Sequence, residues 1–74
     1  MMNQVPTQHD MILEFMRLNE WITPMDAIDE IGCTKLSTRI GELVLMGYEI
    51  ERQTVRKKNR WGKPIHYTRY RLVA

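Results

Sequence analysis

The sequence predicts a single α+β domain in which three helices are followed by a β-hairpin. Apolar residues recur at helical spacing as far as Gly47, and beyond it they alternate with polar residues as they do in strands. A chain of 74 residues, of which 43% are hydrophobic and 27% are charged, has the length and composition of one small globular domain. These observations predict the α+β fold class.

The first helix is expected over residues 8–19. Thr7 and Asp10 have the spacing of a capping box, and the apolar residues that follow repeat with a helical period. The residues ahead of this helix carry no such pattern, so we expect a flexible N-terminal segment, 1–7, and a folded domain, 8–74.

A short extended segment and a short second helix come next. Residues 21–22, Trp and Ile, are strand-forming types. Thr23 can then act as N-cap, Pro24 suits the first helical position, and Gly32 can adopt the left-handed conformation that ends a helix. We therefore expect a helix over residues 24–31.

The third helix follows after only a few residues. Thr34 can cap it, and Leu36, Ile40 and Leu43 fall on one face before Gly47 ends it. A short turn with a glycine, GCT, joins the second helix to the third, which is the spacing of a helix-turn-helix.

The last part of the chain is expected to form two strands, YEIERQTV and IHYTRYRLV. The segment between them, RKKNRWGKP, contains asparagine, glycine and proline, which favour turns. The two strands would thus form a hairpin with a long cationic tip.

Charge is divided unequally along the chain. Residues 1–47 contain three Lys or Arg against seven Asp or Glu, a net charge of −4. Residues 48–74 contain eight against two, a net charge of +6. This asymmetry indicates a polyanionic partner for the second half.

The segments WITPMDAIDEIG and LSTRIGELVLMGYEI, with a glycine-bearing hairpin that closes on YRL, resemble the small winged helix-turn-helix domains of bacteriophages and prophages. The resemblance extends from about residue 8 to the end of the chain. It implies a winged helix, a three-helix helix-turn-helix core followed by a β-hairpin wing. It also implies selective binding of double-stranded DNA in the bacterial host cytoplasm, by a transcriptional regulator or an excisionase-like architectural factor.

The candidate DNA-binding residues lie on the outward side of the third helix and in the hairpin tip. The former would enter the major groove, and the latter would lie on the backbone or in the minor groove. They are Lys35, Ser37, Thr38, Arg39, Arg56, Lys57, Lys58, Arg60, Trp61 and Lys63. Glu42 shares the outward side, where a carboxylate would repel phosphates, and we expect it to be solvated.

Several of these residues have a second, purely structural interpretation. Lys35 has the character of an ordinary surface lysine, and Arg39 is placed to pair with Asp26 or Glu30 of the second helix. Trp61 could fold back to cover the base of the hairpin. The sequence leaves these alternatives open.

Other chemistry has little support. A single cysteine, Cys33, cannot form an internal disulfide, and the two histidines give no metal-ligand spacing with it. There is no nucleophile–base arrangement, phosphate-binding glycine loop, signal peptide or apolar run of membrane-spanning length. We therefore expect no enzyme activity, metal, cofactor, small-molecule substrate or membrane association.

The state of assembly is left open by the sequence. A homodimer and a tandem assembly on DNA are both compatible with it, and Leu45 and Met46 could belong to a dimer contact. The alternative from a different functional class is a winged helix that binds a host or phage protein, with its cationic hairpin on an acidic surface. The acidic first half of the chain and Glu42 keep this alternative open.

Overall fold

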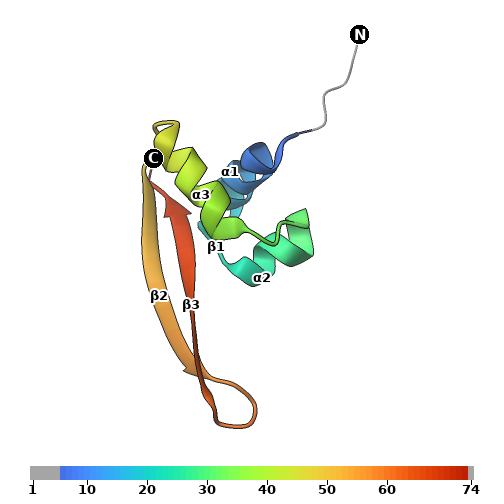
Figure 1. Ribbon diagram of the computed structural model, residues 1–74, viewed down its shortest axis with the longest axis vertical. Coiled ribbons are helices and arrows are strands. Elements are labelled where there is room, and N and C mark those ends of the chain that lie inside the picture. Colours follow the sequence, from blue (N-terminus) through green and yellow to red (C-terminus); the bar gives the residue numbers. More distant parts are fainter. Residues whose placement is uncertain (1–5, 74) are drawn as a thin grey trace.

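The computed structural model describes residues 6–73 and confirms the predicted α+β class. Its elements are α1 (Gln8–Asn19), β1 (Trp21–Ile22), α2 (Pro24–Asp26), a π-helical turn η1 (Ala27–Ile31), α3 (Leu36–Leu45), β2 (Ile50–Lys58) and β3 (Pro64–Leu72). The helices gather at one end of the molecule, and the hairpin of β2 and β3 runs beside them and projects well beyond them (Figure 1).

Two capping boxes set the starts of α1 and α2. The hydroxyl oxygens of Thr7 and Thr23 accept from the amides of Asp10 and Asp26 at 3.2 and 3.1 Å, and each aspartate accepts from the threonine amide in return. Gly32, with φ of +78°, ends η1 in the left-handed conformation. The expected bounds of the first two helices are confirmed, although the π-helical widening of the second was not foreseen.

The start of α3 differs from the prediction. Lys35, not Thr34, is the N-cap residue, and its side chain makes no capping hydrogen bond. Cys33 is buried and its amide donates to the carbonyl of Ala27 at 2.9 Å, which fixes the turn between the helices. Thr34 then lies one position too early for its hydroxyl to reach the first-turn amides of α3.

The core lies between the helices and the base of the hairpin. The expected buried face of α3 is confirmed, since Leu36, Ile40 and Leu43 are at most 4% exposed. The other buried residues come from α1, η1, the turn before α3 and two strands; they are Ile12, Leu13, Met16, Ile22, Ala27, Cys33 and Tyr70. Tyr70 attaches the sheet to the helices, because it belongs to the same buried cluster as the apolar residues of α1 and α3.

The sheet has the strand order β1-β3-β2 and is antiparallel throughout. β2 and β3 pair without interruption from Ile50–Leu72 to Lys58–Pro64, so the predicted loop of residues 56–64 is too long. Arg56, Lys57 and Lys58 are strand residues, because ladder hydrogen bonds join main-chain groups and do not require apolar side chains. Pro64 is tolerated as the first residue of β3.

Part of the expected flexible segment 1–7 falls outside the described residues, since only Pro6 and Thr7 of it belong to residues 6–73. Within that range, no helix combines the length and the apolar character needed to cross a membrane.

Candidate nucleic-acid interface

Strand register sorts the hairpin side chains into two faces. Side chains alternate along a strand, and directly paired residues share a face. The inner face, which carries the core residue Tyr70 at its base, consists of Ile50, Arg52, Thr54, Arg56 and Lys58 with their partners Leu72, Tyr70, Thr68, His66 and Pro64. The outer face consists of Glu51, Gln53, Val55 and Lys57 with Arg71, Arg69, Tyr67 and Ile65.

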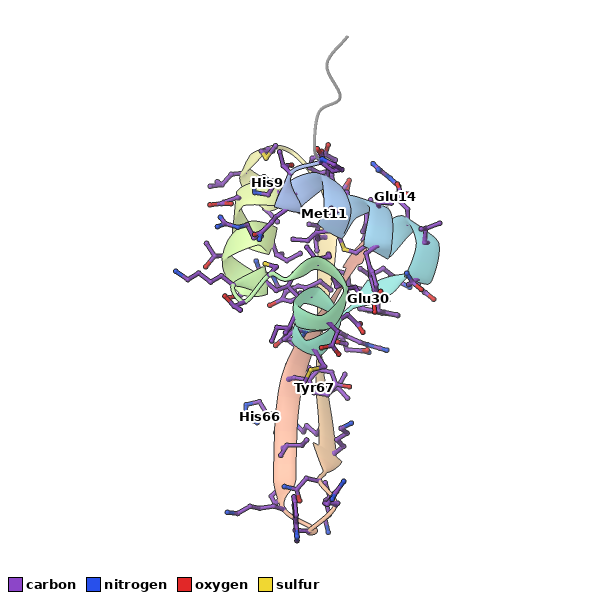
Figure 2. All side chains as sticks on the ribbon, turned by 90° about the vertical axis from the view of Figure 1, so that its right-hand side faces the viewer. His9, Met11, Glu14, Glu30, His66 and Tyr67 are labelled. Carbon is purple, nitrogen blue, oxygen red and sulfur yellow. The ribbon has the colours of Figure 1, made fainter. Side chains whose placement is uncertain are left out.

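The inner face is cationic beyond the core. Arg52, Arg56 and Lys58 are exposed there, and no carboxylate shares the face with them. Figure 2 places His66, the partner of Arg56, on the side of the hairpin on which α3 lies. The part of the inner face that lies near the hairpin tip therefore points toward the same side of the molecule as α3.

The outer face has a different construction. Trp21 of β1 lies beneath two guanidinium groups, with the central carbons of Arg69 and Arg71 at 4.0 and 4.9 Å from its ring centroid. Farther along, Lys57 lies 5.7 Å from the ring centroid of Tyr67. Cation–π contacts of this kind stabilise the sheet. By strand register, Lys57 lies on the face opposite to that of Arg56 and Lys58, its neighbours in sequence.

Arg71 also joins three elements through its carboxylate partners. Its guanidinium donates to Glu20 at 2.9 Å and to Glu51 of β2. These hydrogen bonds, that of Glu20 first, raise the pKa of Arg71 above its usual value. Arg71 is thus engaged within the protein.

The loop at the hairpin tip is organised by Asn59. Its side-chain oxygen accepts from the amides of Trp61 and Lys63 at 2.9 and 3.0 Å, and Gly62 takes the positive φ that the turn requires. Trp61 is 80% exposed, and the guanidinium of Arg60 lies 5.2 Å from its ring centroid. The alternative in which Trp61 covers the hairpin base is therefore wrong.

On α3, the structure separates the four candidate residues. Lys35, Ser37 and Thr38 are exposed at the N-terminal end of the helix. Arg39 is half-buried, and it donates to Gln8 of α1 at 3.1 Å and to Glu42 at 2.8 Å. The alternative in which Arg39 pairs with Asp26 or Glu30 of the second helix is wrong, because α1 and its own helix supply the acceptors.

The side chain of Glu42 is 41% exposed, but the carboxylate is also paired, which the sequence did not predict. One of its oxygens also contacts Nε2 of His9 at 2.7 Å, so the residue links α1 to α3. The hydrogen bond from Arg39, and after it that from His9, lowers the pKa of Glu42. The negative charge of Glu42 is thereby compensated locally, which weakens its repulsion of a polyanion.

Sequence reasoning missed Arg52 as a member of the cationic inner face. Arg52, Arg56 and Lys58 are separated by even numbers of residues, so an uninterrupted strand would have predicted one shared face. The sequence-based prediction ended this strand at residue 55 and assigned Arg56 and Lys58 to the loop, so their shared face with Arg52 was not recognised. Across residues 6–73, no group of three His, Cys, Asp or Glu side chains is placed to hold a metal ion.

A helix-turn-helix packed on a three-stranded sheet, with a long basic hairpin after the last helix, defines a winged helix. A comparison with protein-family models matches residues 7–74 to the winged helix-turn-helix domain family. The chain therefore belongs to this family, whose domains in general bind DNA and are typically not enzymes. Searches of curated proteins and of solved structures found no match.

Proposed function

We propose that this protein binds double-stranded DNA selectively, with α3 in the major groove and the hairpin on the backbone or in the minor groove. One observation carries the proposal. No Asp or Glu follows Glu51 in the sequence, and among residues 6–73 the only cation after it that has an ion pair is Arg71. Arg69 is engaged by Gln53 and Trp21, but the cations nearer the tip are exposed and available to phosphates. Of these, Arg56 and Lys58 lie on the inner face, which points there to the side of α3.

In this proposal α3 reads the bases. A helix about 12 Å in diameter fits the major groove, and Lys35, Ser37 and Thr38 are exposed at the end that would enter it. The first-turn amides receive no capping side chain from Lys35, so they can donate to a phosphate. Arg39 acts chiefly as a positioning residue that holds α3 against α1.

The wing supplies affinity. Arg56, Lys58, Arg60 and Lys63 neutralise phosphates, and Lys57 contributes less because it lies on the outer face. Trp61, held out by the loop, stacks on a sugar or wedges against a base step. The family indicates DNA binding for the domain in general, and these assignments propose which residues of the tip make the contacts.

The biological role we propose is that of a transcriptional regulator or an excisionase-like architectural factor encoded by a phage or prophage. Because its target would be duplex DNA, the site of action would be the bacterial cytoplasm. Footprinting distinguishes the two roles, since one palindromic site indicates a dimeric repressor and several phased sites indicate tandem architectural binding.

The test is a fluorescence anisotropy titration of labelled duplex DNA at several salt concentrations. If about five phosphates are neutralised, log K should fall with log salt with a slope of about −4 to −5. The Arg60→Ala/Lys63→Ala variant should bind all duplexes more weakly, whereas Thr38→Ala should mainly change sequence preference. Binding that is absent at low salt would instead favour the protein-binding alternative.

A further inference from the structure

A groove between α1 and η1 is lined by apolar and acidic residues, and none of the proposed DNA contacts involves it. It encloses about 450 Å³, and its lining includes the apolar residues Met11, Phe15 and Leu18 and the acidic residues Asp10, Glu14 and Glu30. Figure 2 shows Met11, Glu14 and Glu30 on the face of the helical end that is turned toward the viewer. The groove therefore offers an apolar surface with a negative rim.

Both components of the groove are open to a partner. Leu18 is 74% exposed, so its apolar surface is accessible to a partner. Glu14 and Glu30 are exposed, and neither has an ion-pair partner within residues 6–73. A suitable occupant would carry an apolar side chain flanked by cations.

The hairpin tip of the same protein has these properties. Trp61 is 80% exposed and lies between Arg60 and Lys63 in sequence, and the tip carries no acidic residue. Asn59 fixes the loop through the amides of Trp61 and Lys63, so little conformational entropy is lost when the tip is bound. Aromatic and arginine side chains of this kind are the usual anchors of protein interfaces.

We propose that the groove between α1 and η1 binds the hairpin tip of a second copy of this protein, with Trp61 on the apolar surface and Arg60 and Lys63 against Glu14 and Glu30. The tip lies at the opposite end of a molecule 53 Å long, so it cannot reach the groove of its own chain (Figures 1 and 2). The contact joins two different surfaces and is therefore head-to-tail, so that it either closes into a ring or extends into a chain of molecules.

This inference goes beyond the proposed function and does not require it. A single loop in a shallow groove buries less area than a stable interface, so we expect dissociation constants of about 10 to 100 μM. The same Trp61 cannot contact DNA and the groove at once, so duplex DNA would compete with self-association if the tip also binds DNA.

The experiment is sedimentation velocity of the purified protein without DNA, from about 5 to 500 μM at low salt, a range that brackets the expected affinity. The mean sedimentation coefficient of the parent protein should rise with concentration. Trp61→Ala and the Glu14→Lys/Glu30→Lys variant should each weaken association at least about tenfold. Asp29→Lys/Glu49→Lys changes the charge equally, at exposed residues that do not line the groove, and should have little effect.

Mixing the two impaired variants gives the decisive result. Trp61→Ala keeps its groove, and Glu14→Lys/Glu30→Lys keeps its tip, so an equimolar mixture should form a heterodimer and no larger species. A parent protein that stays monomeric, or a mixture that does, would overturn the proposal. A DNA titration of the groove variant, which retains α3 and the hairpin, shows separately whether the proposed function holds.

Discussion

Arg39 and Glu42 lie one turn apart on α3 and are joined by a 2.8 Å contact between Nη1 and Oε1. The same carboxylate oxygen lies 2.7 Å from Nε2 of His9 on α1. Arg39 also donates to Gln8 of α1, so the helix proposed to enter DNA is tied to the first helix by a polar cluster beside the core. This cluster occupies the position where the sequence suggested a base contact and a free carboxylate.

The cluster predicts a loss of stability in acid. The pKa of Glu42 is lower in the folded protein than its ordinary value of 4.5. Its stabilising contribution is therefore fully present above that value and is lost as the pH falls through the lowered pKa. Thermal unfolding followed by circular dichroism from about pH 7 to pH 3 should show a shallower fall in Tm for Glu42→Gln than for the parent protein.

A matched control is available on the same helical end. Glu14→Gln removes an exposed carboxylate that has no hydrogen-bond partner in the described part of the chain. Its Tm should decline in acid as steeply as that of the parent protein. If both variants behave alike, the contacts of Glu42 do not stabilise the fold.

Two of the three threonines predicted to be caps, Thr23 and Thr34, should differ in their effect on stability. Thr23 accepts from the amide of Asp26 at 3.1 Å, so Thr23→Ala should lower the free energy of unfolding by about 1 kcal/mol. Thr34 precedes the N-cap residue of α3 and makes no capping hydrogen bond, so Thr34→Ala should change it by less than about 0.5 kcal/mol. Urea unfolding measures both, and an equal loss would contradict the placement of the cap at Lys35.

The helices could be predicted closely because their signals are local. Thr7 with Asp10, and Thr23 followed by Pro24, satisfy backbone groups within a few residues of themselves. The apolar period of α3 likewise identified its buried face. The sequence therefore predicted the bounds of the first two helices, the order of elements and the winged-helix class.

The site could be predicted only in part, because its geometry depends on long-range pairing. Charged residues such as Arg56 and Lys58 carry no strand signal, yet the register with β3 extends through them. Arg39 finds its acceptor on Gln8, 31 positions earlier in the chain, and no local pattern indicates that choice. The exposure of Trp61 likewise follows from a loop that Asn59 closes with hydrogen bonds.

Trp21 should be important for stability although it lies outside the buried core. Its half-buried ring packs under the guanidinium groups of Arg69 and Arg71 and joins β1 to β3. Trp21→Ala removes the ring, and we expect the free energy of unfolding to fall by about 2 kcal/mol. Trp21→Phe keeps an aromatic face and should lose less than half as much in urea unfolding. Equal losses would show that the cation–π contacts contribute little.

The two faces of the hairpin give the sharpest test of how the wing meets DNA. Lys57 and Lys58 are adjacent, exposed and identical in charge, but Lys58 lies on the inner face and Lys57 on the outer face near Tyr67. If the inner face meets DNA, Lys58→Ala should weaken binding about threefold to tenfold at moderate salt and reduce the salt slope by about one. Lys57→Ala removes the same charge and should change affinity by less than about twofold, because only long-range attraction is lost.

Anisotropy titrations of both variants against one duplex, at three or more salt concentrations, make the comparison. Circular dichroism should show that both fold like the parent protein, since both side chains are exposed. Equal losses for the two lysines would mean that the wing attracts DNA only as a diffuse charge. A larger loss for Lys57→Ala would place the duplex on the outer face, away from α3, and would contradict the shared interface of helix and wing.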